Sequence, residues 1–155
     1  MGRKAGVRLL DVGPDHDVLE IGAGTGQNLP RITGDLDRGS LTLVDFSVTS
    51  LRVAARKANR AKANVRLIAG DASHLPIRTA FDRILFSCCL SLLPQPLQIL
   101  EVAAKMLKPG GFIVVADFGR MAGWGPARSL IEWWLDRHSV VPVYECLESL
   151  VHHLN

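Results

Sequence analysis

The chain has 155 residues, of which 48% are hydrophobic and 21% are charged, and its formal net charge is +3. This length predicts one domain with a substantial core, and the composition excludes an intrinsically disordered chain. The three cysteines, two of them adjacent, match neither a disulfide framework nor the spacing of a metal site, so a reducing cytoplasm is expected. The start of the chain lacks the apolar stretch of a signal peptide, and the longest apolar run, residues 84–93, is too short to cross a bilayer.

Apolar periodicity and turn signals predict alternating helices and strands along the chain. Strands are expected at 17–21, 41–45, 65–69, 81–87 and 112–116. Helices are expected at 2–11, 26–33, 48–61, 96–107, 127–138 and 143–154. The run Leu107–Gly111 is interpreted as a helix stop and a turn. This alternation predicts the α/β class, with a doubly wound, mostly parallel sheet flanked by helices.

The loop after the first strand carries glycines at every second position, Gly22, Gly24 and Gly26, and follows the acidic residue Glu20. Glycine permits positive φ and lets a ligand lie against the backbone. The free N–H groups at the start of the following helix favour a polar or anionic ligand group. A dinucleotide-binding fingerprint would place its last glycine at Gln27, so the spacing departs from that fingerprint.

The ends of the second and fourth strands supply further candidates. Asp45 lies 21 positions after Gly24, where a carboxylate at a strand tip can accept hydrogen bonds from both ribose hydroxyls. A helix cap is the alternative role, although Ser47 is the better cap candidate for the helix 48–61. Cys88 and Cys89 follow the fourth strand without a paired histidine or further thiols at ligand spacing. Both are therefore expected to be small buried side chains that line the site, rather than a nucleophile or metal ligands.

Four motifs resemble those of class I S-adenosylmethionine-dependent methyltransferases. They are E-x-G-x-G-x-G at 20–26, the acid at 45, G-D-A at 70–72 and L-K-P-G-G at 107–111. The resemblance covers residues 17–117 and implies binding of S-adenosyl-L-methionine, with S-adenosyl-L-homocysteine as the product. It implies that Asp71 accepts from the adenine amino group, although an Asx turn would also explain this residue. The implied cofactor-binding residues are Glu20, Gly22, Ala23, Gly24, Thr25, Gly26, Asn28, Asp45, Phe46, Ser47, Asp71, Ala72, Ser87, Cys88 and Leu90.

A second, looser resemblance concerns the methyl acceptor. The run 88–94, the segment 116–119, a helix with Trp133 and Trp134, and the run 138–142 look like bacterial lipid N-methyltransferases, which act on phosphatidylethanolamine or homoserine betaine lipids. This resemblance implies methylation of a small amine or an amine lipid head group. A neutral amine needs alignment rather than a strong base, so no catalytic residue and no metal site are assigned.

The distribution of charge raises the question of a membrane partner. Six basic residues and no acid lie between Leu51 and Arg66, and Arg52, Arg56 and Arg60 fall on one helical stripe. A solvated helix face is the simpler explanation, and attraction to an anionic membrane is the alternative. No aromatic residues interleave with these charges, so nucleic-acid binding is not expected. The expected location is the cytoplasm, with peripheral contact at the inner membrane surface.

A single domain is expected, with its core at 17–117 and a C-terminal helical segment at 123–155. The family it resembles usually has seven strands, whereas five are predicted here, so the sheet is expected to be shortened at its C-terminal edge. An uncovered fifth strand would favour association, and a homodimer would cover it. Two alternative functions remain open, an NAD(P)-dependent oxidoreductase on a similar sheet and a non-catalytic, methyltransferase-like partner subunit.

Overall fold

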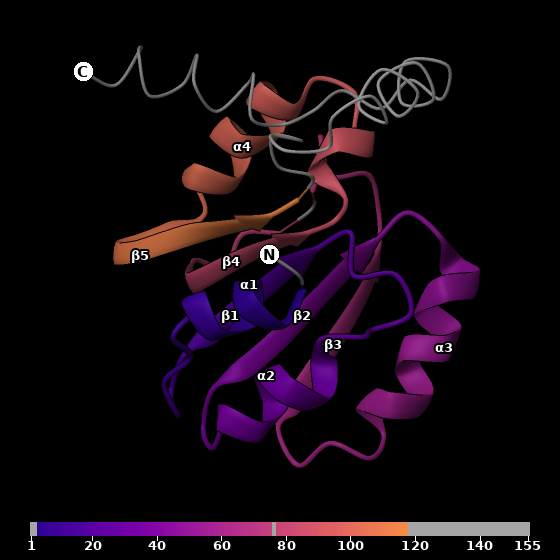
Figure 1. Ribbon diagram of the computed structural model, residues 1–155, viewed down its shortest axis with the longest axis vertical. Coiled ribbons are helices and arrows are strands. Elements are labelled where there is room, and N and C mark those ends of the chain that lie inside the picture. Colours follow the sequence, from indigo (N-terminus) through magenta and orange to yellow (C-terminus); the bar gives the residue numbers. More distant parts are fainter. Residues whose placement is uncertain (1–2, 76, 118–155) are drawn as a thin grey trace, which may run out of the picture.

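The computed structural model describes residues 3–75 and 77–117, which form a parallel sheet flanked by helices (Figure 1). The strands are β1 (Asp17–Ile21), β2 (Ser40–Asp45), β3 (Asn64–Ala69), β4 (Phe81–Ser87) and β5 (Leu107–Ala116). They lie in the order β3-β2-β1-β4-β5, and every neighbouring pair is parallel. The predicted α/β class with a doubly wound sheet is confirmed, and β5 forms one edge of the described sheet.

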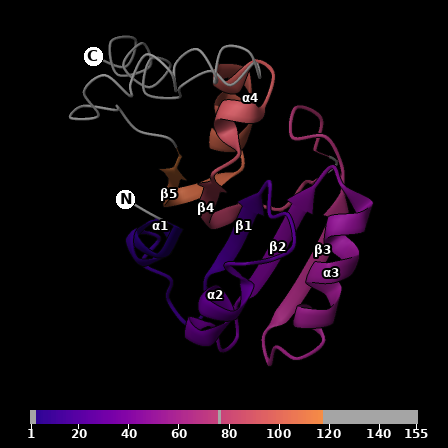
Figure 2. The same ribbon diagram turned by 45° about the vertical axis from the view of Figure 1, so that its right-hand side comes forward.

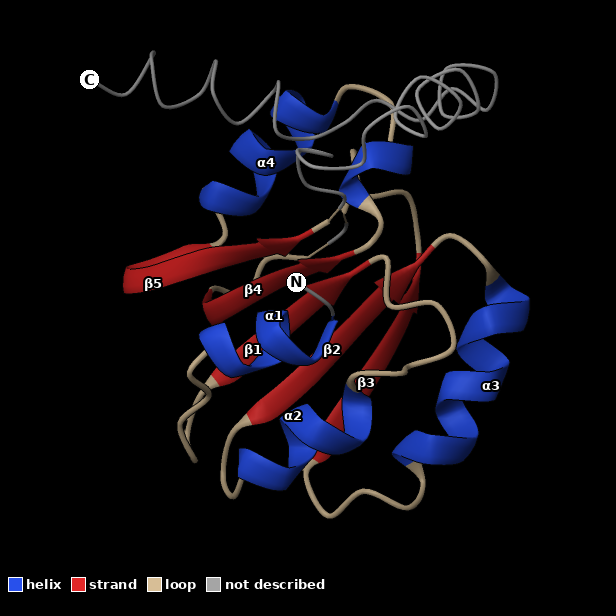
Figure 3. Cartoon of the chain, viewed as in Figure 1, coloured by secondary structure: helices blue, strands red, loops and turns tan. Residues whose placement is uncertain are grey.

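Helices cover both faces of this sheet. They are α1 (Arg3–Leu9), α2 (Leu29–Asp35), α3 (Val48–Ala58), the 3-10 helix η1 (Leu90–Leu92) and α4 (Pro96–Ala104). The first three contribute side chains to a buried cluster on one face, and η1 and α4 contribute to a cluster on the other. Figures 2 and 3 show α4 on the side of the sheet opposite to α1 and α2. Because the helices occupy the faces, the carboxyl ends of the strands are left for a site.

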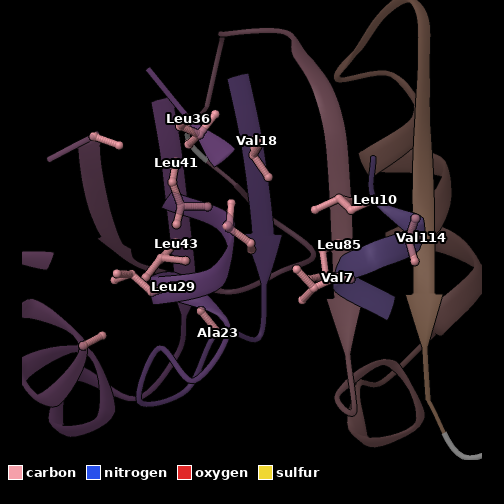
Figure 4. Close-up of a cluster of buried hydrophobic side chains, with 13 residues drawn as sticks. Val7, Leu10, Val18, Ala23, Leu29, Leu36, Leu41, Leu43, Leu85 and Val114 are labelled. Atoms are coloured by element: carbon pink, nitrogen blue, oxygen red, sulfur yellow. The ribbon is translucent and has the colours of Figure 1, made fainter. Parts of the chain in front are cut away.

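Alternate residues of the strands supply the two buried clusters. In β1, Val18 packs into the cluster under α1, α2 and α3, whereas Leu19 packs into the cluster under α4. In β2, Leu43 and Val44 repeat this alternation. Figure 4 shows the first cluster, in which strand side chains meet Leu29 of α2. Successive side chains of a strand point to opposite faces, so continuous apolar runs such as these fit a sheet buried on both sides.

Two predicted boundaries are wrong because of local glycine geometry. Helix α2 begins at Leu29 rather than at Gly26, because Gly26 has a φ of +65°, which a right-handed helix excludes. The run Leu107–Gly111, predicted as a turn, forms the first half of β5. It pairs with β4 through a register shift, and Gly110 at a φ of +80° accommodates the extra residues.

The larger of the remaining differences lie at helix ends. Helices α3 and α4 end three residues earlier than predicted, at Ala58 and Ala104. Helix ends fray, and the apolar pattern locates them less sharply than it locates strands. The helices predicted at 127–138 and 143–154, and with them the C-terminal segment 123–155, lie outside the described residues. Within the described ranges, no helix is long and apolar enough to cross a membrane.

A charge network joins β1, β4 and β5 at their amino ends. Lys108 Nζ lies 2.8 Å from Asp17 Oδ2 and 2.8 Å from Asp82 Oδ2. Asp82 Oδ2 also accepts a hydrogen bond of 2.8 Å from the backbone N–H of Asp17. Partial burial works to raise the pKa of each carboxyl, but the hydrogen bonds from Lys108 contribute to a net lowering of both pKa values. The lysine therefore links three strands through two ionised carboxylates.

Replacing this lysine tests the network. Lys108→Met is expected to destabilise the fold by about 1–2 kcal/mol at neutral pH, because two neighbouring carboxylates lose their shared cation. A lowered carboxyl pKa stabilises the fold above the ordinary value of 3.8, and this contribution is lost as the pH falls through the lowered pKa. The difference from wild type should therefore shrink near pH 3, as measured by urea unfolding at both pH values. Lys105→Met, at an exposed lysine, is the matched control, and equal losses in the two variants would contradict the linking role.

Candidate functional site

Two adjoining pockets open at the carboxyl ends of the strands. The chain runs outward from β1 to β2 and from β4 to β5, so a crevice forms between β1 and β4. A pocket of about 280 Å³ lies there, called the glycine-loop pocket, and it is lined by Arg3, Glu20, Gly22, Ala23, Gly24, Thr25, Gln27, Asn28, Ser87 and Cys88. The second, called the β2 pocket, has about 340 Å³ and is lined by Ile21, Gly22, Val44, Asp45, Phe46, Gly70, Ala72, Cys88, Cys89, Leu92 and Leu93. Gly22 and Cys88 line both, so the pockets form one crevice.

The glycine loop presents bare main chain to this crevice. Gly24 has a φ of +54°, and a Cβ built there would have no heavy atom within 4 Å. The backbone at Gly24 therefore borders open space. Gly22 also has a positive φ, of +71°, but a Cβ there would lie 2.5 Å from the Cβ of Cys89. Glycine is required at both positions by conformation, and at Gly22 also by close packing.

Glu20 lies at the base of the glycine-loop pocket and is almost fully buried. Its Oε1 accepts a hydrogen bond of 2.7 Å from Asn28 Nδ2, while its Oε2 has no partner among the described residues. Burial raises the pKa of this carboxyl to about 7, against the lowering effects of Asn28 and Arg3. Ser87, from the end of β4, lines the same pocket, and its Oγ is likewise buried without a partner in the described part of the chain. Buried polar atoms are almost always hydrogen-bonded, so two such atoms on one pocket indicate a polar ligand there.

Asp45, at the tip of β2, connects the two pockets. Its Oδ2 accepts a hydrogen bond of 2.7 Å from the backbone N–H of Gly24, and its Oδ1 accepts one of 2.8 Å from that of Ser47. Ser47 itself caps α3, because its side chain accepts a hydrogen bond of 3.2 Å from the backbone N–H of Ser50. Asp45 lines the β2 pocket, and each of its oxygens can accept a further hydrogen bond.

Asp71 forms the Asx turn that was the alternative explanation for it. Its Oδ1 accepts hydrogen bonds from the Ser73 backbone N–H at 2.8 Å and from the Ser73 hydroxyl at 2.7 Å. These bonds lower the pKa of the Asp71 carboxyl. The side chain is exposed and lies outside the lining of the β2 pocket, although its neighbours Gly70 and Ala72 belong to that lining.

The adjacent cysteines differ sharply in environment. Cys88 is exposed, has a strained φ of +55° and lines both pockets. Cys89 is buried, and its thiol donates a hydrogen bond of 3.1 Å to the carbonyl of Ile21. Burial raises the pKa of Cys89 to about 12, so this thiol stays protonated at neutral pH. Cys89 is thus buried lining, whereas the thiol of Cys88 is accessible to reagents.

The structure brings most of the predicted site residues together. Those that line the crevice are Glu20, Gly22, Ala23, Gly24, Thr25, Asn28, Asp45, Phe46, Ala72, Ser87 and Cys88. Those that lie outside it are Gly26, Ser47, Asp71 and Leu90, of which Leu90 is fully buried in the cluster under α4. Sequence reasoning missed the lining residues Arg3, Ile21, Gln27, Val44, Gly70, Leu92 and Leu93. Gln27 adjoins the glycine motif and could have been inferred, whereas Arg3 reaches the pocket only because α1 packs against β4 and β5.

The fold is that of the class I methyltransferases. Residues 18–111 match a family described as a methyltransferase domain, and the chain belongs to this family. The resemblance inferred from the four sequence motifs is therefore confirmed at the level of the family, whose members use S-adenosylmethionine. A crystal structure of a SAM-dependent methyltransferase from Aquifex aeolicus shares the fold, with a TM-score of 0.67 at 20% identity, covering 87% of this chain and 77% of that one.

Two curated relatives carry names that specify a substrate class. The chain is 33% identical over 126 residues to a demethylmenaquinone methyltransferase of Renibacterium salmoninarum, covering 80% of this chain and 50% of that protein. It is 30% identical over 107 residues to a ubiquinone/menaquinone biosynthesis C-methyltransferase of Coxiella burnetii, covering 66% and 43%. The chain thus spans about half the length of the curated relatives that it matches. Neither name supports the looser resemblance to N-methyltransferases of amine lipids.

Proposed function

We propose that this chain binds S-adenosylmethionine in the crevice and transfers its methyl group to a small-molecule acceptor. The observation that carries the proposal is a pair of buried polar atoms, Glu20 Oε2 and Ser87 Oγ, that have no partner within residues 3–75 and 77–117 and lie on a pocket bordered by bare glycine backbone. Such a pocket fits the methionine end of the cofactor, which carries an ammonium and a carboxylate. The ammonium would face the Glu20 carboxylate, and the carboxylate would face Arg3, the one cation that the described part of the chain contributes to the pocket lining.

The β2 pocket fits the adenosine end. The free lone pairs of Asp45 would accept from the ribose hydroxyls, and Phe46 and Ala72 would border the adenine ring. Asp71 remains the proposed acceptor for the adenine amino group, beside the pocket residues Gly70 and Ala72. Ala23, Thr25 and Asn28 would complete the methionine subsite, while Gly26, Ser47 and Leu90 would support the crevice from outside its lining.

The cofactor supplies an already activated methyl group, bonded to a sulfonium sulfur. The protein must therefore align this group with the acceptor and exclude water, which are roles of shape rather than of acid–base chemistry. Ser87 and Cys88, at the carboxyl end of β4, would border the methyl group, because Cys88 lines both pockets and Ser87 lines the glycine-loop pocket beside it. No catalytic base is assigned among the described residues.

The names of the relatives favour a quinone ring as the methyl acceptor. Methylation of a demethylmenaquinone-like ring carbon is accordingly the first acceptor proposed here. An amine lipid head group is the second, and its support is the sequence resemblance alone. A radiolabelled methyl assay with a short-chain demethylmenaquinol and with phosphatidylethanolamine in parallel decides between them. Cofactor binding without label on either acceptor would favour a non-catalytic partner subunit.

Contact with an anionic membrane and a homodimer are the proposed associations. Arg52 and Arg56 are exposed on α3, and Arg60 is exposed in the turn after it, beyond the end of the predicted helical stripe. These exposed cations support attraction to anionic lipid. Flotation with phosphatidylglycerol vesicles should show association that weakens with added salt. The edge position of β5 supports self-association, which sedimentation would measure. Peripheral contact at the inner membrane surface follows only if this association is found, whereas the proposed cytoplasmic location rests on the cysteine usage.

The accessible thiol of Cys88 provides a direct test of cofactor binding. S-adenosylhomocysteine at about ten times its Kd is expected to slow alkylation of Cys88 about tenfold, because the ligand covers the crevice. Cys89 should stay unlabelled, since it is buried and its pKa is raised to about 12. A Cys146→Ser background leaves these two thiols for mass spectrometry. Unchanged labelling at saturation would place the ligand elsewhere, and protection by NADH alone would favour the oxidoreductase alternative.

A further inference from the structure

We propose that Lys57 is a positioning residue, which holds the peptide planes of the glycine loop from the side of α3. Its Nζ donates a hydrogen bond of 2.7 Å to the carbonyl of Thr25 and one of 3.3 Å to that of Gly26. The consequence for cofactor binding rests on the function proposed above, whereas the effect on the loop does not.

The direction of the lysine side chain is unusual for its place in the helix. Lys57 lies in the last turn of α3, where a basic residue ordinarily interacts with the free carbonyls of its own helix end. Its ammonium instead reaches carbonyls that lie 32 and 31 residues earlier in the chain. Both bonds are charge-assisted and therefore stronger than bonds between neutral groups.

These bonds determine which way the loop amides point. In a trans peptide the C=O and the following N–H point in opposite directions. The Gly26 carbonyl points to Lys57, so the N–H of Gln27 points away from α3, and Gln27 lines the glycine-loop pocket. The Thr25 carbonyl also points to Lys57, and the N–H of Gly26 is directed to the carbonyl of Ala23 at 3.0 Å. Glycine permits other peptide orientations at low energy, so a loop of this composition needs such a restraint.

A packing contact also indicates that α3 holds the glycine loop in place. A Cβ added to Gly26 would lie 3.1 Å from the Cβ of Ala54, so the loop rests directly on α3 at that point. Ala54 and Lys57 are three residues apart and share one face of the helix. At its other end, the loop is held by the bond from the Gly24 N–H to Asp45. The loop is thus held by a carboxylate at Gly24 and by an ammonium at Thr25 and Gly26.

The test compares Lys57→Met with Arg56→Met, which removes an exposed cation from the preceding position of α3. In the empty protein, amide hydrogen exchange of residues 24–28 should be about tenfold faster in Lys57→Met and unchanged in Arg56→Met. Lys57→Arg, which keeps a cationic donor, should recover most of the protection. Should Lys57→Met fail to fold, Lys57→Gln gives the same comparison.

A comparison of the Kd values of two ligands distinguishes a local effect on the glycine loop from a general loss of stability. 5′-Methylthioadenosine shares the adenosine of S-adenosylhomocysteine but lacks its amino-acid portion, which is the part assigned to the glycine-loop pocket. Lys57→Met should raise the Kd of S-adenosylhomocysteine about tenfold more than that of 5′-methylthioadenosine. The proposal would be overturned if loop exchange in Lys57→Met equalled that of wild type, or if this variant lost affinity equally for both ligands. It would also be overturned if Arg56→Met had the same effects as Lys57→Met. Failure of the wild-type protein to bind either ligand would refute the proposed function, while the exchange comparison would still decide the role of Lys57.

Discussion

Replacement of Glu20 by glutamine is expected to weaken S-adenosylhomocysteine binding about 100-fold, while stabilising the empty protein above neutral pH. In wild type, Glu20 Oε2 is buried without a partner among the described residues, and Oε1 is bonded to Asn28. A ligand ammonium would satisfy the carboxylate, and this charge-assisted pairing is lost with a neutral amide. The same carboxyl is unfavourable in the empty protein because its burial disfavours the ionised form.

The pH dependence of stability follows from the raised pKa of Glu20. Below pH 4.5 the carboxyl is protonated in both the folded and the unfolded chain, so it contributes nothing. Between 4.5 and about 7 the unfolded chain has lost this proton and the folded chain retains it, so stability falls as the pH rises. Above about 7 the loss is complete and is on the order of 3 kcal/mol. The glutamine variant lacks this loss, so its advantage in Tm should grow across that window and then stay constant.

Proton release on ligand binding provides the complementary measurement. Ligand binding stabilises the ionised carboxylate, so wild type should release close to one proton near pH 6 and almost none near pH 8.5. Calorimetry in buffers of different ionisation enthalpy measures this release. Asp45 and Arg3 are the charged groups that act on Glu20, and neither changes in the variant. Glu101→Gln, at an exposed acid on α4, is the matched control, and equal proton release by wild type and Glu20→Gln would contradict the assignment.

Two alanine substitutions in the glycine loop should separate stability from binding. Gly22→Ala is expected to destabilise the fold by about 2–4 kcal/mol, because its Cβ would meet the Cβ and Sγ of Cys89 at 2.5 and 2.6 Å while φ is positive. Gly24→Ala should cost about 1 kcal/mol, since only the positive φ opposes it and no heavy atom lies within 4 Å. The methyl group of Gly24→Ala would nevertheless occupy space assigned to the ligand.

Urea unfolding and calorimetry distinguish these effects. Gly24→Ala should bind S-adenosylhomocysteine about 100-fold more weakly than wild type while it remains folded. Gly34→Ala, at an exposed helical glycine that also has open space for a Cβ, is the matched control and should leave binding unchanged. Wild-type affinity in Gly24→Ala would show that the ligand does not lie against this backbone, and the proposed function would then lose its structural basis.

Local patterns predicted the central strands β1, β2 and β4 closely because both faces of the sheet are buried there. The predicted bounds of β1 and β4 match the structure, and those of β2 and β3 differ by one residue at the start. Continuous apolar runs ended by Gly, Asp or Ser allow few other placements in a parallel sheet. The prediction failed at Gly26 and in the run Leu107–Gly111, where backbone dihedrals and pairing with β4 determine the conformation.

The sequence by itself determined the fold class, the position of the glycine loop and the methyltransferase family, because these depend on apolar periodicity, on short motifs and on the order of both along the chain. Only the tertiary structure decided which polar atoms are partnered. It leaves Glu20 Oε2 unpartnered among the described residues, turns Asp71 onto Ser73, and brings Lys57 to the loop carbonyls of Thr25 and Gly26. These outcomes depend on how helices and strands distant in sequence pack together and which rotamers that packing permits, and no local periodicity encodes them.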